Sequence, residues 1–256
     1  MAELKLCVIG ARGRLGQRIC ALASESSLLN LSAGVVREGA PTDVSGVLYT
    51  SDLQSALGQA DVVIDVSFPS TCLAALPLCR EKKIAYVCGT TGLGEAEKDA
   101  LTQAANDIPV MLAANFSIGV NVLRKLVAKA AQLLGDDFVP EVFEIHHGKK
   151  KDAPSGTALA LGSEVKEVRP HLQDIFDRSA TDVERGANDL GYSALRGGDV
   201  AGEHTVFFFG EAERIELTHR ATSRDIFARG ALRAAEFLHG QAAGTYTMQD
   251  VLEVHA

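Results

Sequence analysis

The fold is decided by the stretch LKLCVIGARGRLGQRICAL, residues 4–22. Its first six residues form a nearly continuous apolar run, which is typical of a strand buried on both faces of a parallel sheet. Gly10, Gly13 and Gly16 follow the run, and apolar residues at helical spacing follow the glycines. Glycine-rich turns are common, but a turn between a strand and a helix favours a site where the backbone approaches a pyrophosphate.

The alternation of strand and helix patterns continues to residue 117 and defines the first half of the chain. The predicted strands are 31–36, 61–66, 84–88 and 109–113, and the predicted helices are 52–57, 69–82 and 95–106. Such alternation predicts an α/β fold, a Rossmann-type doubly wound parallel sheet.

The pattern changes after the predicted helix 120–134. A strand at 141–147 and a helix at 155–166 precede an irregular polar stretch, 174–191, in which no pattern is found. Runs with alternating β-branched and aromatic residues follow at 192–196, 204–209 and 214–219. They predict a mixed, largely open sheet in a second, α+β domain.

The last predicted helix, 224–238, carries small residues on one face and should return to the first domain. We therefore expect residues 1–117 and 225–256 to form a dinucleotide-binding Rossmann domain. Residues 118–224 should form a substrate-binding and oligomerisation domain.

Composition excludes several classes of function. The 256 residues carry a formal net charge of −8, which argues against nucleic acid or an acidic membrane as the main partner. The chain has neither a signal-peptide pattern nor a long apolar run, and we expect a cytoplasmic location. Its five cysteines include no Cys-x-x-Cys, so buried reduced thiols are expected rather than disulfides or a metal site.

Reactive chemistry concentrates in EIHHGKKKDAPSGTA, residues 144–158. Two histidines are followed by three lysines, which make the loop locally positive and suited to an anionic ligand. Ser155 is a good N-cap, and the amides of Gly156 and Thr157 would lie at a helix start, where carboxylates and phosphates bind. Structural histidines, a solvated lysine loop and a simple helix cap are the alternatives. The dinucleotide pattern in the same chain favours an active site.

This segment resembles the signature of the dihydrodipicolinate reductase family, whose members reduce 4-hydroxy-tetrahydrodipicolinate with NAD(P)H in the diaminopimelate and lysine pathway. The resemblance implies that His146 is the acid/base residue and Lys150 the proton donor. It also implies substrate contacts from four residues. These are His147, Ser155, Gly156 and Thr157.

The resemblance extends over essentially the whole chain, outside about 168–191, and implies the cofactor contacts. They lie in the glycine turn, at the end of the second strand and in two loops that follow later strands. The residues are Gly10, Ala11, Arg12, Gly13, Arg14, Leu15, Arg37, Gly89, Thr90, Thr91, Ala113, Ala114, Asn115 and Phe116. Gly89-Thr90-Thr91 taken without the resemblance is equally consistent with an ordinary turn.

The end of the second strand bears on the choice of nucleotide. In the family an acid commonly precedes an arginine there, whereas this chain has Val36 before Arg37. Because a guanidinium suits a 2′-phosphate and the partner of a free 2′-hydroxyl is missing, we expect NADPH to be preferred over NADH. A shifted alignment would give the acid's role to Glu38. Phe68 stands where some members have an arginine.

Two other kinds of protein remain as alternatives. A different two-domain NAD(P) oxidoreductase is one, but a semialdehyde enzyme that uses a thioester needs a cysteine in the second domain, and every cysteine precedes residue 89. A catalytically inactive NADP sensor is the other. His204 and His219 are expected to be structural or near the substrate pocket. The resemblance implies a homotetramer, and residues 206–209, apolar on both faces of a strand, fit a sheet covered by another subunit.

Overall fold

The computed structural model describes residues 3–39, 47–179, 182 and 184–253. The contacts divide the chain into two compact units. The first unit comprises residues 1–118 and 225–256, and the second comprises residues 119–224. Each unit has its own sheet and its own buried core.

The sheet of the first unit has seven strands in the order β12-β6-β5-β4-β1-β2-β3, and all neighbours are parallel. From the adjacent strands β1 and β4, the strand order runs outward in opposite directions. The boundary between these two strands is the topological switch point, where ligands bind in such sheets. The strands are β1 (Leu4–Ile9), β2 (Leu29–Val35), β3 (Leu48–Thr50), β4 (Val62–Asp65), β5 (Ala85–Cys88), β6 (Pro109–Leu112) and β12 (Gly244–Tyr246).

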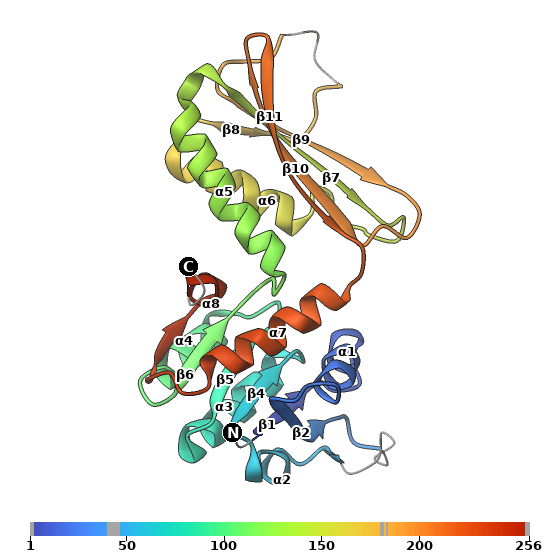
Figure 1. Ribbon diagram of the computed structural model, residues 1–256, viewed down its shortest axis with the longest axis vertical. Helices are drawn as coiled ribbons and strands as arrows, with labels where there is room; N and C mark the ends of the chain where they lie inside the picture. Colours follow the sequence, from blue (N-terminus) through green and yellow to red (C-terminus); the bar gives the residue numbers. More distant parts are fainter. Residues whose placement is uncertain (1–2, 40–46, 180–181, 183, 254–256) are drawn as a thin grey trace. The chain divides into compact units, whose positions relative to one another are not determined.

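Helices cover both faces of this sheet (Figure 1). α1 (Arg14–Ala23), α7 (Asp225–Leu238) and α8 (Met248–Glu253) pack on one face, with Leu6 and Val8 of β1. α3 (Pro69–Lys82), α4 (Glu95–Ala104) and the short α2 (Leu53–Ala56) with η1 (Leu57–Gln59) pack on the other, with Cys7 and Ile9. Alternate residues of β1 thus point into opposite cores, as its continuous apolar run predicts.

The second unit contains a mixed five-stranded sheet in the order β11-β10-β7-β9-β8. α5 (Ile118–Leu134) and α6 (Gly156–Val168) pack on one face of it (Figure 1). β7 (Val139–His146) is central, antiparallel to β10 (Gly202–Gly210) and parallel to β9 (Asp189–Arg196). The outer strands are β8 (Gln173–Ile175) and β11 (Glu213–Ala221), and the 3₁₀ turn η2 (Gly135–Asp137) precedes β7.

The structure confirms the predicted fold class and corrects its details. Three short strands, β3, β8 and β12, were not predicted, because three-residue strands at sheet edges are too short and too exposed to show a pattern. The stretch 174–191 is not wholly irregular, since it contains the end of β8 and the start of β9. α7 packs on the first unit as expected, with Ala228, Ala231, Ala235 and Leu238 fully buried.

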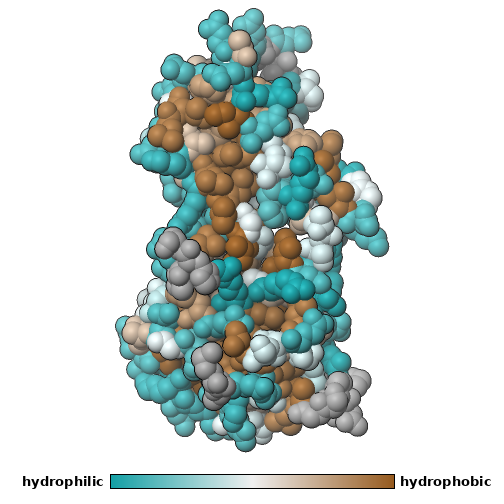
Figure 2. All heavy atoms as spheres, viewed as in Figure 1, coloured by the Kyte–Doolittle hydropathy of each residue, from teal (hydrophilic) through white to brown (hydrophobic). Residues whose placement is uncertain are grey.

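The surface of the second unit carries exposed apolar side chains along α5 (Figure 2). Leu126 is 52% exposed and Leu133 is 73% exposed. All five cysteines are buried and free. Among the residues that the structure describes, no helix is both long enough and apolar enough to cross a membrane.

Candidate active site

The glycine turn at the end of β1 packs so closely against neighbouring backbone that side chains at Gly10 and Gly16 would clash. Gly10 has φ +84°, in the left-handed region, and a Cβ there would lie 2.7 Å from the carbonyl oxygen of Val66. A Cβ on Gly16 would lie 2.1 Å from the carbonyl oxygen of Gly10. α1 follows with Gly13 as its N-cap, and no side chain caps it. The first turn of α1 therefore presents backbone N–H groups, which suit a pyrophosphate.

A cavity of about 760 Å³ opens beside this turn. The turn forms one wall, the end of β2 a second, and the loop after β4 with the start of α3 a third. Arg37 is exposed at the end of β2, and its guanidinium lies 5.1 Å from the centre of the Phe68 ring. Phe68 is thus brought into the site as the surface on which Arg37 stacks. Val36 lines the same wall and is buried.

The buried carboxyl group of Asp65 joins the two loops that follow β4 and β5. It accepts hydrogen bonds from the hydroxyls of Ser67 at 2.5 Å, Tyr86 at 2.5 Å and Thr90 at 3.1 Å. Burial raises the pKa of Asp65, against the opposing effect of these hydrogen bonds. Because Thr90 belongs to the predicted nicotinamide loop, Asp65 fixes that loop against the loop that carries Phe68.

The remaining predicted cofactor contacts lie at the same edge of the sheet. The ring of Phe116 lies against Gly89, where a Cβ would come within 2.4 Å of it. The amide of Ala113 donates to the carbonyl of Cys88 at 2.9 Å, and the side chain of Asn115 accepts from the amide of Ser117 at 2.8 Å. The carboxyl ends of parallel strands share one edge, which explains why residues from β1, β2, β5 and β6 gather there.

In the second unit, the carboxylate of Glu144 is bonded to the first histidine of the signature. Glu144 is 1% exposed, and its Oε2 lies 2.6 Å from Nδ1 of His146. Arg196 donates to both carboxylate oxygens, at 2.7 and 2.8 Å. Burial alone would raise the pKa of Glu144, but the hydrogen bonds from Arg196 and His146 outweigh burial and lower it. Glu144 is therefore ionised at neutral pH.

Ser155 ties the start of α6 to the same group. Its amide donates to Glu144 at 3.0 Å, and its hydroxyl caps the helix by accepting from the amide of Ala158 at 3.1 Å. The hydroxyl also lies 3.0 Å from Nε2 of His204, whose ring packs edge-on against His146. Ser155 is only 2% exposed, whereas Gly156, the next residue, is exposed and has open space where a side chain would be.

The loop between β7 and α6 is positively charged. Partial burial, followed by the charges of Arg224, His146 and Lys150, lowers the pKa of His147, so this imidazole is neutral at pH 7. The ammonium of Lys150 is paired with the carboxylate of Asp152 at 2.7 Å. Cations that surround a neutral histidine favour an anionic guest.

The predicted site residues thus form two groups, one in each unit. The nucleotide residues line one edge of the first sheet, and His146, His147, Lys150 and the start of α6 surround the end of β7. Sequence reasoning gave no role to Glu144, Arg196 or Asp65. The sequence does contain a signal for Glu144, because it lies two residues before His146 in the same strand. Residues two apart on a strand point to the same face, so Glu144 can reach His146.

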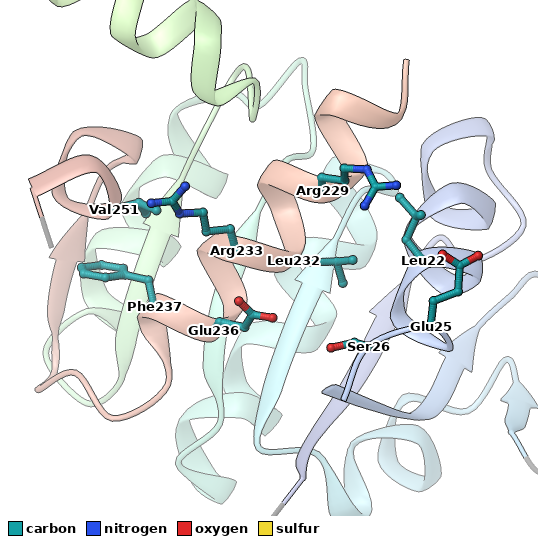
Figure 3. Close-up of a pocket in the computed structure, with 9 residues that line it drawn as sticks. All are labelled: Leu22, Glu25, Ser26, Arg229, Leu232, Arg233, Glu236, Phe237 and Val251. Atoms are coloured by element: carbon teal, nitrogen blue, oxygen red, sulfur yellow. The ribbon is translucent and has the colours of Figure 1, made fainter. Parts of the chain in front are cut away.

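A second cavity of the first unit, about 550 Å³, contains none of the predicted contacts. Figure 3 shows Arg229 of α7 pointing toward Leu22 and Glu25, near the end of α1, whereas Arg233 of α7 points toward Val251. α1 begins at the nucleotide edge, so this cavity lies toward the opposite edge. In the described part of the chain, no cluster of His, Cys, Asp or Glu could hold a metal ion.

Because His204 is buried, we predict that the protein becomes less stable at acidic pH. Burial, and then the charge of His146, lowers the pKa of His204 to about 4, whereas an unfolded histidine takes up a proton near pH 6.5. Between these values the unfolded state binds more protons, so the free energy of unfolding should fall as the pH drops from about 6.5 to 4. Glu144 adds loss in the same direction at the acidic end.

Urea unfolding at pH 7, 5.5 and 4.5 measures this loss. His204→Gln should reduce it, and His171→Gln, at a half-exposed histidine of the same unit, should leave it as in the wild type. An equal loss in His204→Gln and the wild type would show that His204 does not titrate in this way.

Known proteins resemble this chain over both units. The sequence model described as "Dihydrodipicolinate reductase, N-terminus" matches residues 4–116, and the one described as "Dihydrodipicolinate reductase, C-terminus" matches residues 119–252. The 4-hydroxy-tetrahydrodipicolinate reductase of Pseudoalteromonas translucida is 41% identical and covers 99% of this chain and 100% of its own. The enzyme of the same name from an Anaeromyxobacter species is 46% identical and covers 97% of each.

A solved structure gives the same fold. Dipicolinate-bound dihydrodipicolinate reductase from Paenisporosarcina sp. TG-14 superposes with a TM-score of 0.82 at 23% identity and covers 97% of this chain and 99% of that one. With both family models matched over most of the chain, and relatives above 40% identity over nearly all of it, this chain belongs to the dihydrodipicolinate reductase family.

Proposed function

We propose that the chain reduces 4-hydroxy-tetrahydrodipicolinate to tetrahydrodipicolinate in the diaminopimelate and lysine pathway, with His146 and Lys150 handling the proton. The family and the names of the relatives support the reaction. The product lacks the 4-hydroxyl group of the substrate. The balanced reaction therefore takes up a hydride and one proton and releases water. The observation that carries the proposal is the grouping of His146, Lys150 and the exposed Gly156 amide around the end of β7.

The two units divide the work in this proposal. Residues 1–117 and 225–256 hold the reduced pyridine nucleotide, which supplies the hydride when bound. The glycine turn would hold the pyrophosphate, and the Asp65-fixed loop with Thr90 would hold the nicotinamide end. Residues 118–224 hold the substrate. The cavity beside Gly10 and the tight packing of that turn support the nucleotide assignment.

The second unit supplies charge and protons in this proposal. The amides of Gly156 and Thr157, at the start of α6, would bind one substrate carboxylate. Lys150 would exchange its pairing with Asp152 for the substrate and donate a proton, and His146 would act as the acid/base group. His147, neutral among cations, would contact the ring. Positive groups around a dicarboxylate would draw electron density from the ring and favour arrival of the hydride. Ser155 would frame the carboxylate site from beneath.

The nucleotide would be NADPH in preference to NADH. Arg37 stacks on Phe68 in the lining of the cavity, and this contact supports a role for its guanidinium in binding a 2′-phosphate. Val36, which stands where the family commonly has an acid, offers no acceptor for the hydroxyls of NADH. The cation–ring contact adds a reason for the preference that the sequence alone lacked.

The protein would be a cytoplasmic homotetramer. Phe207 and Phe209 stack at 5.4 Å on the face of the sheet opposite α5 and α6, and Phe209 is 37% exposed. Leu195 on the same face is 54% exposed. An exposed apolar sheet face of this kind supports burial by another subunit.

The activity and the preference are tested together with the purified protein. Enzymatically generated 4-hydroxy-tetrahydrodipicolinate should cause loss of NADPH absorbance, with a higher kcat/KM for NADPH than for NADH. Arg37→Ala should lower kcat/KM for NADPH selectively, since it removes the partner of the 2′-phosphate. Arg80→Ala, at a surface ion pair of the same unit, is the control. No turnover with either nucleotide would favour an NADP sensor, and equal or better use of NADH would refute the preference.

The proton-handling residues are tested by kinetics of variants. General acid catalysis contributes roughly 10²–10⁴-fold, so His146→Gln or Lys150→Ala should lower kcat by about that factor. Binding of NADPH should be nearly unchanged, because both residues lie in the other unit. The controls are His171→Gln and Lys129→Ala, surface residues of the second unit. Full turnover in both active-site variants would discard these roles.

A further inference from the structure

The carboxylate of Glu144 is surrounded by hydrogen-bond donors. Its Oε1 accepts from the amide of Ser155 at 3.0 Å and from Arg196 at 2.7 Å. Its Oε2 accepts from Arg196 at 2.8 Å and contacts Nδ1 of His146 at 2.6 Å. An ionised carboxylate only accepts hydrogen bonds, so Nδ1 of His146 must carry a hydrogen. The proton that His146 gains or loses is therefore the one on Nε2.

The surroundings of Nε2 keep that nitrogen approachable. Gly202 lies beside it, and a Cβ at this position would be 3.0 Å from Nε2. Gly202 also has φ +153°, which side chains rarely adopt. A residue other than glycine would therefore crowd the nitrogen that the first histidine offers.

Stability is a poor explanation for this arrangement. A buried ion pair loses the hydration of both charges, and apolar residues of similar volume often serve stability equally well. Arg196 also leaves its buried Nε without a hydrogen-bond partner in the described structure. A functional role explains a network with this free-energy cost better than stability does. In other enzymes, carboxylates orient catalytic histidines through the same kind of contact.

We propose that Glu144 is a positioning residue that fixes the Nδ1–H tautomer and the ring orientation of His146, so that Nε2 exchanges the proton during reduction. Arg196 keeps Glu144 ionised and donates to the carbonyl of Asp152 at 2.6 Å, in the loop that carries Lys150. Through Ser155 the same carboxylate holds the start of α6. One buried charge thereby sets the acid/base group, the lysine loop and the carboxylate site. This inference rests on the proposed role of His146.

The kinetic test is a double-mutant cycle with Glu144→Gln and His146→Gln. Glutamine keeps the shape but brings a donor against donors, so Glu144→Gln should lower kcat by about 10²-fold, with KM for NADPH unchanged. In the His146→Gln background the same change should lower kcat by much less than it does in the wild type, because most of the effect of Glu144 is exerted through His146. Glu164→Gln is the matched control, since Glu164 also pairs with an arginine, Arg124, in the second unit. Full kcat in Glu144→Gln, or additive losses in the cycle, would overturn the proposal.

A spectroscopic measurement on the wild type reports the tautomer of His146 without relying on the folding of Glu144→Gln. The ¹⁵N and ¹H correlation spectrum of the His146 ring, assigned by its loss in His146→Gln, should show the Nδ1–H form whenever the ring is neutral. A neutral ring with hydrogen on Nε2 would refute the positioning role. An active wild type that shows this result would refute only this inference, whereas an inactive wild type would count against the proposed function.

Discussion

A buried carboxylate must accept hydrogen bonds that offset the loss of its hydration. The donors that surround Glu144 hold together the elements of the second unit that carry the proposed site. Arg196 and the amide of Ser155 donate to this carboxylate, and Nδ1 of His146 lies 2.6 Å from it, so its partners come from β9, the start of α6 and β7. Removing any one of these elements would leave the buried charge with fewer hydrogen-bond partners. The strand that carries His146, the loop with Lys150 and the helix start at Gly156 are therefore fixed relative to one another. The proposed chemistry depends on this rigidity, since a proton donor and a carboxylate site must act on one ring.

The first unit differs, because its proposed site lets a charged ligand approach the backbone closely. Gly10 and Gly16 remove side chains where the turn touches its neighbours, and the first turn of α1 is left with amides that no side chain caps. Asp65 joins the loops after β4 and β5 through hydroxyl groups. Hydroxyl groups around one buried carboxyl group thus join the loops of the first unit, whereas the carboxylate of Glu144 in the second unit is paired with a guanidinium.

The sequence predicted the elements that have strong periodicity and the residues that carry an unusual motif. The α/β class, the helix 69–82 and the second domain with a mixed sheet were all predicted and are confirmed. The network around His146 was not, because it depends on strand register. Arg196 lies opposite His146 on β9, and His204 lies opposite Glu144 on β10. These partners are about 50 to 60 residues apart in sequence, and only the folded pairing places them on one face. The contact of Arg37 with Phe68 was missed because these residues follow two different strands, β2 and β4, and only the folded sheet brings them together.

The central claim is that the end of β7 and the start of α6 form the binding site of a dicarboxylate ring. A crystal structure of this chain with dipicolinate tests it most directly, since that compound has the two carboxylates and the ring that the site should hold. We predict one carboxylate within hydrogen-bonding distance of the Gly156 and Thr157 amides, and the ring beside His146 and Lys150. Dipicolinate bound at a well-ordered position away from these four residues would contradict the account.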